Sequence, residues 1–260
     1  MSDPRDTDER EGGWVSRLFV PPIAALQFLT LCPPIIRRMF TSAEMGWAVG
    51  AFSLVGALLG GVLAGLDWGL ARLLPTEVST VLVLAASVGA TGALHLDGYL
   101  DACDGLLGGH TPESRLEIMR DERVGAFGLA GGVLLLLLKF TALSASSDRV
   151  TALILASTLS RWAIALAIAF CPYAREKGLG RAMKDHAGSA QAALATTVAL
   201  AVAWLAGGWT GLLAIGLAGT VTWMAARYAL KRLPGLTGDL YGAISELVEA
   251  AVLLLFVLKS

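Results

Sequence analysis

Long apolar stretches, separated by short polar ones, run through nearly the whole chain. A helix that spans the hydrocarbon core of a bilayer needs about 20 consecutive, mostly apolar residues. The pattern therefore predicts an all-α fold, a polytopic integral membrane bundle with about seven transmembrane helices. The predicted spans are 45–66, 78–96, 125–147, 150–170, 191–207, 209–230 and 243–258.

The residues before the first predicted span have a different pattern. Residues 18–32 read LFVPPIAALQFLTLC, an apolar run that Pro21 and Pro22 interrupt and that is too short to span. We expect a short interfacial or re-entrant helix there. Residues 1–17 are polar and mixed in charge, without the apolar core of a cleaved signal peptide. We expect a disordered cytoplasmic arm, followed by a single membrane-embedded domain over 18–260.

Composition supports a membrane protein. The chain is 55% hydrophobic and only 16% charged, whereas soluble proteins are about one-quarter charged. A formal net charge of −1 offers no basic surface for nucleic acid. Cys32, Cys103 and Cys171 have no paired spacing, so the sequence predicts neither a disulfide framework nor a zinc site.

Basic residues are distributed unequally between the two sides of the predicted bundle. Only Arg72, Arg149 and Lys259 fall on one side, and most of the other Lys and Arg residues fall on the opposite side. Because loops rich in Lys and Arg stay in the cytoplasm, the N-terminus is predicted inside a bacterial inner membrane and the C-terminus outside. The loops with unusual chemistry then all face the cytoplasm: 97–124, 171–190 and 231–242.

Three aspartates end the second predicted span, in the stretch HLDGYLDACDGLLGG. Asp97, Asp101 and Asp104 are spaced i, i+4 and i+7, which places their carboxylates on one face of a helix. The helical rise separates the outer two by roughly 10 Å, which suits two divalent cations, or one cation and a diphosphate. Like charges this close repel, and hard carboxylate oxygens suit Mg²⁺. The sequence therefore predicts that they hold one or two Mg²⁺ ions, the alternative being ordinary solvated acids at the membrane boundary.

The neighbours of the aspartates extend this candidate site. Gly98 and Gly105 directly follow the first and last aspartates, and we expect their small size to let a bulky ligand approach the helix backbone. His95 is a candidate metal ligand or substrate contact, the alternative being a packed histidine. No HExxH pattern accompanies it, which disfavours a zinc protease.

A basic segment, TPESRLEIMRDERVGAFG, follows the aspartates. Thr111 and Pro112 predict the start of a helix. Arg120 and Arg123 alternate with acidic residues, and guanidinium groups match the geometry of phosphate oxygens. We expect both arginines to clamp phosphate beside the metal site, the alternative being a solvated helix with internal salt bridges.

Charged residues also interrupt later spans. Lys139 follows a run of leucines and Arg161 lies inside the next span. Charges within spans face the bundle interior or a cavity, so both are candidate substrate contacts, although Arg161 could instead extend toward the helix end. The loop GLGRAMKDHAGS, which contains His186, is either an anion contact or a flexible basic loop.

A second acidic stripe lies near the C-terminus, in PGLTGDLYGAISELVE. Asp239, Glu246 and Glu249 are spaced i, i+7 and i+10, again roughly one face of a helix. We expect Asp239 and Glu246 to bind substrate or to complete the metal shell. The alternative is that a buried glutamate pairs with Lys139 or Arg161.

These motifs resemble those of the cobalamin synthase family, the adenosylcobinamide-GDP ribazoletransferases. The resemblance rests on ALQFLTLCP, GALHLDGYLDACDGLLGG, RLEIMRDERVGAFG and GLTGDLYGAISELVE, in that order, and extends over 24–258. One departure is LCPPIIRR, where relatives tend to have a basic residue before the prolines. The acidic motif is also vaguely similar to that of CDP-alcohol phosphotransferases, which suggests similar metal chemistry rather than the same fold.

The resemblance implies a polytopic, Mg²⁺-requiring inner-membrane enzyme that completes the nucleotide loop of vitamin B12. Adenosylcobinamide-GDP and α-ribazole, or its 5′-phosphate, would give adenosylcobalamin, or its phosphate, and GMP. The ribazole hydroxyl would attack the phosphorus on the corrinoid side, while Arg120 and Arg123 stabilise the phosphoryl oxygens. His95, Asp104 and Asp239 are candidate general bases. The lipid bilayer and other nucleotide-loop enzymes are the expected partners.

Two other functions remain open. A cation-coupled transporter would use intramembrane Asp, Glu and Lys as an ion path, although the acids cluster on one side and no pair of matching broken helices marks two repeats. A CDP-alcohol phosphotransferase would act on a lipid, but its motif expects further acids and an Arg where this chain has LLGG. A transporter would not release GMP, and a lipid enzyme would prefer a CDP-linked donor.

Overall fold

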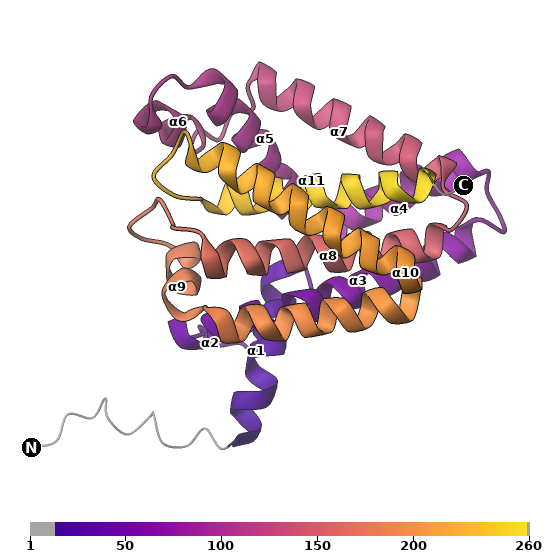
Figure 1. The fold of residues 1–260 in the computed structure, drawn as a ribbon, viewed down its shortest axis with the longest axis horizontal. Coiled ribbons are helices and arrows are strands. Elements are labelled where there is room, and N and C mark those ends of the chain that lie inside the picture. The colour runs from indigo at the N-terminus through magenta and orange to yellow at the C-terminus, as the bar shows by residue number, and fades with distance from the viewer. Residues whose placement is uncertain (1–13, 259–260) are drawn as a thin grey trace, which may run out of the picture.

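The computed structural model describes residues 14–258, and over that range its regular elements are helices. The long helices lie alongside one another, with α6 and α9 at one end of the bundle and the C-terminus at the other (Figure 1). The predicted all-α, polytopic fold is confirmed. In chain order the elements are α1 (Trp14–Leu29), α2 (Ser42–Ala48), η2 (Val49–Ala51), α3 (Phe52–Leu70), α4 (Thr76–Ala90), α5 (Leu94–Gly108), α6 (Pro112–Ile118), α7 (Ala126–Ala145), α8 (Arg149–Phe170), α9 (Leu179–His186), α10 (Ser189–Leu230) and α11 (Gly238–Val257).

Within the described residues, 5 helical stretches are long and apolar enough to cross a membrane, or up to 6 with the bent pair α4–α5 counted as one span. One of them, α10, is two helices joined at Gly208, whose φ of 53° and ψ of −128° are not helical. The chain turns back there, so the two halves of α10 run in opposite directions (Figure 1). With this hairpin counted as two crossings, all the predicted apolar stretches are present, and the boundary predicted between 191–207 and 209–230 falls at the break.

The predicted span 78–96 extends too far, because α4 ends at Ala90. The axis of α5 is bent by 88° from that of α4. Gly92 and Ala93 both have a φ of 59°, in the left-handed region that favours glycine. The Ala93 N–H donates to the Val88 carbonyl, which is the bond of a Schellman motif and ends the helix. The three aspartates therefore lie on a separate helix, at the spacing that places them on one face.

Helix α1 begins within the predicted disordered arm, so residues 14–17 are helical, whereas 1–13 lie outside the described residues. Its apolar part, Phe19–Leu29, is too short to cross a membrane, as predicted. Pro21 and Pro22 do not interrupt the helix. Both lie inside α1, more than one turn after its start, where a proline ring without an N–H group removes a helical hydrogen bond without ending the helix.

Helix α8 forms the centre of the bundle, with 83% of its most apolar stretch buried. Helix α3 packs against it through glycines spaced four residues apart. A Cβ at Gly60 would lie 2.7 Å from the Cα of Ile154, and one at Gly56 would collide with the Ser157 carbonyl oxygen. Without a hydrophobic effect between helices in lipid, such close backbone contact is a main source of helix association.

A network of buried ion pairs joins α7, α8 and α11 inside the bundle. The Lys139 ammonium bonds to Glu246 and lies 3.1 Å from Oε1 of Glu249. The other oxygen of Glu249 lies 3.1 Å from Nη1 of Arg161, which also donates to the Ser160 hydroxyl at 2.8 Å. Each charge therefore has an opposite charge beside it, which a buried charge in a membrane requires.

The structure does not bring Lys139, Arg161 and Glu246, the predicted substrate contacts, to a space of ligand size. Their charged groups are paired with one another, and the cavity that they line measures about 10 Å³. A space of that size holds about one water molecule and no nucleotide or corrinoid. The alternative from the sequence, a buried glutamate paired with Lys139 or Arg161, is the arrangement found, and Glu249 pairs with both.

Replacing Gly60 with Ala should destabilise the protein by about 1–3 kcal/mol, because the added methyl group meets the α8 backbone. Gly61 is the matched control, since a Cβ there has no heavy atom within 4 Å. Thermal unfolding in detergent would measure both variants. Equal midpoints for Gly60→Ala and Gly61→Ala would contradict the close packing of α3 on α8.

Replacing Lys139 with Met should lower the free energy of unfolding by about 3–5 kcal/mol, because Glu246 then loses its countercharge inside the bundle. The double variant Lys139→Met with Glu246→Gln should recover much of this loss. Denaturation of the purified protein in mixed micelles would measure both. A single variant with wild-type stability and no turnover would instead restore Lys139 as a substrate contact.

Candidate active site

Three loops that are distant in sequence meet at the end of the bundle that carries α6 and α9. The segment after α8 pairs with the segment before α11, because the Leu236 N–H donates to Pro172 and the Ala174 N–H to Leu236, both at 2.8 Å. Arg175 then reaches the Met119 carbonyl, after α6, at 3.4 Å. The structure thus gathers the chemically unusual loops at one end, as the sequence predicted.

A cavity of about 310 Å³ lies at this end, between α1, α5, α8 and α11 and beneath the loop that leads into α9. Aliphatic and aromatic side chains form part of its wall. Its titratable lining residues are His95, Asp97, Tyr173, Arg175, Lys177, Asp239 and Tyr241. The volume is at the lower end of the range for small-molecule sites, and both signs of charge are present.

Close contact between α5 and α11 brings two acidic stripes together at the cavity. A Cβ at Gly98 would lie 2.9 Å from the Asp239 carbonyl oxygen, and one at Gly242 would lie 2.9 Å from that of His95. The missing side chains therefore allow Asp97 and Asp239 to line the same space. Gly98, for which the sequence predicted a ligand contact, lines it as well.

The electrostatic balance around these acids is uneven. Asp239 is 2.6 Å from Nη2 of Arg175 and also accepts from the Thr237 hydroxyl at 3.2 Å. Asp101 experiences the negative charges of Asp97, Asp239 and Asp104, and Arg175 is the cation that opposes them. One guanidinium group thus faces a cluster of carboxylates, and an additional positive charge would stabilise the cluster.

Asp104, a predicted metal ligand and candidate general base, lies outside the lining of the cavity. Its carboxylate accepts the backbone N–H groups of Gly125 at 2.7 Å and Gly128 at 2.8 Å, at the start of α7. A Cβ at either glycine would collide with the carboxylate. A negative group at a helix N-terminus is stabilised by the unpaired N–H groups and the helix dipole, so Asp104 anchors α7 to α5.

Gly105 also differs from its prediction. The space beside it is filled by the side chain of Met119 and by the backbone of Arg115, both from the α6 region. The structure therefore places α6, and no open space, beside Gly105, and the glycine allows α6 to pack against α5.

Three buried polar atoms that belong to cavity-lining residues have no hydrogen-bond partner among the described residues: Nδ1 of His95, Oη of Tyr241 and Nε of Arg175. Buried polar groups in folded proteins nearly always have partners, supplied by protein, water or ligand. Three such atoms in the wall of one cavity mark this wall as unusually rich in unsatisfied polar groups. His95, the predicted metal ligand or substrate contact, is 4% exposed and lies in the wall of this cavity.

Neither Arg120 nor Arg123 lies at the cavity. Both are exposed, and Arg123 pairs with Asp121 at 2.7 Å, which lowers the pKa of that aspartate to about 2. Arg175 and Lys177 line the cavity instead. In the sequence, both residues belong to the glycine-rich, basic stretch REKGLG. That stretch could have indicated a phosphate contact, but its charge was used only to predict on which side of the membrane the loop lies.

The loop with His186 is more ordered than a flexible connection. It forms α9, in which the His186 ring bonds to the Ala182 carbonyl at 3.0 Å and a Cβ at Gly46 would collide with His186. Lys184 donates to the Ala169 carbonyl at 2.9 Å, and burial lowers the pKa of its ammonium group. These side chains thus fasten α9 to α2 and α8 beside the cavity.

Within the part of the chain that the structure describes, no three His, Cys, Asp or Glu side chains converge closely enough to enclose a metal ion. Mg²⁺ in phosphate-transfer sites is usually held by one or two carboxylates together with substrate phosphates and water. Asp97 and Asp101 form no salt bridge with other described residues, and the charge balance at Asp101 favours a cation. These two carboxylates fit shared coordination of that kind, whereas Asp104 does not.

Comparison with known proteins places the chain in a family. Residues 21–257 match the family model of cobalamin-5-phosphate synthase. A relative from Desulforamulus reducens, named adenosylcobinamide-GDP ribazoletransferase, is 38% identical over 90% of this chain and 94% of its own length. A relative of the same name from Stutzerimonas stutzeri is 41% identical over 90% of this chain and 96% of its own length. Another, from Roseiflexus sp., is 36% identical over 90% of this chain and 88% of its own length. No solved structure matches. The chain therefore belongs to the cobalamin-5-phosphate synthase family of transferases.

Proposed function

We propose that the chain transfers the phosphocobinamide group of adenosylcobinamide-GDP to α-ribazole, or to its 5′-phosphate, with release of GMP and in dependence on Mg²⁺. Family membership supports the reaction class. The main support for placing the reaction at this cavity is its lining, which includes Asp97, Asp239, Arg175 and Lys177. It presents cations for a diphosphate and carboxylates for a metal ion.

The residues of the cavity suit phosphoryl transfer. Arg175 and Lys177 would bind the diphosphate oxygens, since a guanidinium fork matches phosphate geometry and an ammonium adds charge. Asp97 and Asp101 would hold Mg²⁺ jointly with those oxygens, and the ion would neutralise charge that builds on the leaving phosphate. The ribazole hydroxyl attacks the phosphorus on the corrinoid side, and the bond to the GMP oxygen breaks with its electron pair leaving on GMP.

Asp239 is the proposed acceptor of the hydroxyl proton. In the absence of substrate its carboxylate is paired with Arg175. When the diphosphate draws the guanidinium group away, Asp239 becomes free to accept a proton from the attacking hydroxyl. Phosphoryl transfer depends more on positioning than on a strong base, so a carboxylate is sufficient. His95, with its unpaired Nδ1, would orient a substrate group rather than take the proton.

The proposed location is a bacterial inner membrane, with the cavity open to the cytoplasm. The loops that surround the cavity contain most of the loop Lys and Arg residues, and such loops remain inside. At the other end, Arg149 is bound to Asp67 and to the Thr80 hydroxyl, so its charge is neutralised within the bundle. Membership of a transferase family, and not the buried pair of Lys139 and Glu246, favours this enzyme over a transporter.

Replacing Asp101 with Asn should reduce GMP release at least about 100-fold and raise the Mg²⁺ concentration needed for half-maximal rate, because the cation loses a charged partner. Asp121→Asn is the control, since Asp121 is exposed and lies outside the cavity. The measurement is GMP and corrinoid product formation in lipid-supplemented detergent, with Mg²⁺ titrated. Normal turnover of the Asp101 variant would disprove the metal role.

Replacing Arg175 with Ala should lower kcat/KM for adenosylcobinamide-GDP about 100- to 1,000-fold, because the diphosphate loses its guanidinium contact. Arg175→Lys should recover part of the loss. Arg120→Gln should remain within about twofold of wild type, as expected for an exposed surface residue. Steady-state kinetics would test all three, and a larger loss at Arg120 than at Arg175 would return the phosphate clamp to its sequence-predicted position.

A further inference from the structure

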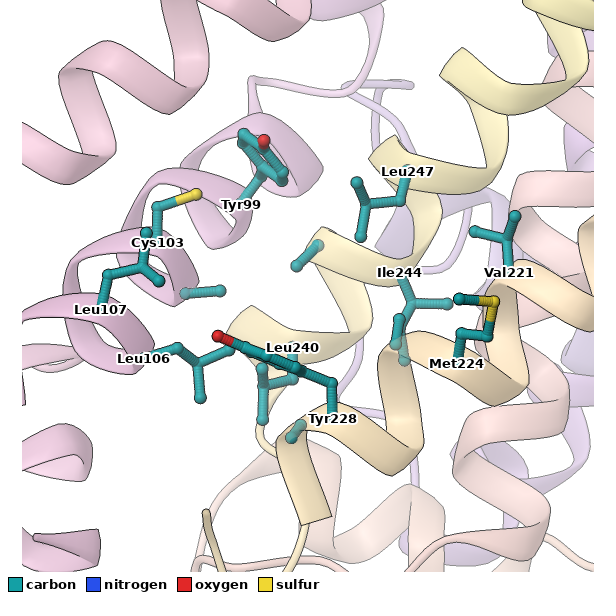
Figure 2. A pocket seen from close by; sticks show the side chains of 14 residues that line it. Tyr99, Cys103, Leu106, Leu107, Val221, Met224, Tyr228, Leu240, Ile244 and Leu247 are labelled. Carbon is teal, nitrogen blue, oxygen red and sulfur yellow. The ribbon is translucent and has the colours of Figure 1, made fainter. Parts of the chain in front are cut away.

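A second, larger hollow lies on the opposite side of the contact between α5 and α11. It is a groove of about 450 Å³, formed by α5, α11 and the second half of α10 (Figure 2). Tyr99, Cys103 and Leu107 project into it from α5 and face Met224 and Tyr228 of α10 (Figure 2). No acidic or basic side chain is among its lining residues. The proposed reaction makes no use of this space.

The groove is apolar along its length and basic at one end. Its α10 lining includes Val221, Ala225 and Tyr228, and the same helical stripe continues to Arg232 just beyond the helix. The Arg232 guanidinium carbon lies 3.6 Å from the centre of the Tyr228 ring, which fixes the charge beside the groove. This is the end of the bundle at which α10 leads into the loops of the cavity.

Further positive charges lie beside Arg232. Lys231 is its exposed neighbour, and Arg227 is exposed one turn earlier, with its guanidinium carbon 6.0 Å from the Trp223 ring centre. Arg115 of α6 donates to the Arg232 carbonyl at 3.5 Å, and its Nε is buried without a partner among the described residues. Arg232 and Arg115 thus lie together at one end of the groove, and Lys231 and Arg227 add positive charge to the neighbouring surface of α10.

We propose that the groove binds an anionic phospholipid, with an acyl chain between α5, α10 and α11 and the phosphate against Arg232. The apolar length fits a hydrocarbon chain, and the charge at its end complements a negatively charged headgroup. Tyrosine at the same end is typical of the level of lipid headgroups. The inference goes beyond the proposed reaction and does not depend on it, because the groove and the cavity share no lining residue.

The first test compares phospholipid retention by native mass spectrometry after exchange into an equimolar mixture of phosphatidylglycerol and phosphatidylcholine. Wild type should retain phosphatidylglycerol in preference, and Arg232→Gln should reduce that preference about fivefold, the loss expected for one basic residue at the membrane surface. Arg72→Gln is the matched control, because Arg72 also stacks on an aromatic ring, that of Trp68, but lies away from the groove. Equal effects of the two variants, or no headgroup preference in wild type, would overturn the proposal.

The second test locates the lipid on the wild-type protein. Phosphatidylglycerol with a photoreactive group in its acyl chain should crosslink to peptides from α5 and from the second half of α10. Ala225→Phe, which fills the groove, should abolish these crosslinks, whereas Ala201→Phe, on the exposed surface of the first half of α10, should not. Crosslinks elsewhere would overturn the proposal. So would conversion of a dimer to a monomer by Ala225→Phe, which would assign the groove to a second copy of the chain.

Discussion

Helices α5 and α11 touch backbone to backbone where Gly98 meets Asp239 and Gly242 meets His95. This contact brings the acids of two distant segments to one cavity and separates that cavity from the apolar groove behind it. In a membrane, helices gain little from burying apolar surface against each other, so close approach through glycines is a principal source of their association. The geometry of the site therefore depends on Gly98 and Gly242, which have no functional side-chain group of their own.

Charge balance explains how the remaining polar residues divide between stability and function. Lys139, Arg161, Glu246 and Glu249 satisfy one another inside the bundle. Asp104 is satisfied by two backbone N–H groups of α7. Around Asp101, by contrast, the carboxylates exceed the nearby cations. Because an unbalanced cluster in a low-dielectric setting is costly, this excess supports the cation proposed to bind at Asp101.

The sequence predicted the apolar stretches closely, including the boundary in α10 that falls at Gly208. It missed the break at Gly92, because hydropathy continues unchanged through ATGALHL and only the backbone conformation interrupts the helix. The glycine in that stretch was a possible signal, since Gly is the usual residue at a helix C-terminus. Arg175 was missed for another reason: a basic loop residue has the same appearance in sequence whether it binds a ligand or only sets orientation.

What the sequence by itself determined was the membrane class, the grouping of polar loops at one end, and the helical stripe of Asp97, Asp101 and Asp104. These depend on hydropathy and on the local period of a helix, which are properties of neighbouring residues. Only the tertiary structure decided which charges neutralise each other: that Lys139 pairs with two glutamates, that Asp104 caps α7, and that Arg175 faces Asp239. Those pairings join residues far apart in the chain, so their partners are fixed by helix packing and not by spacing.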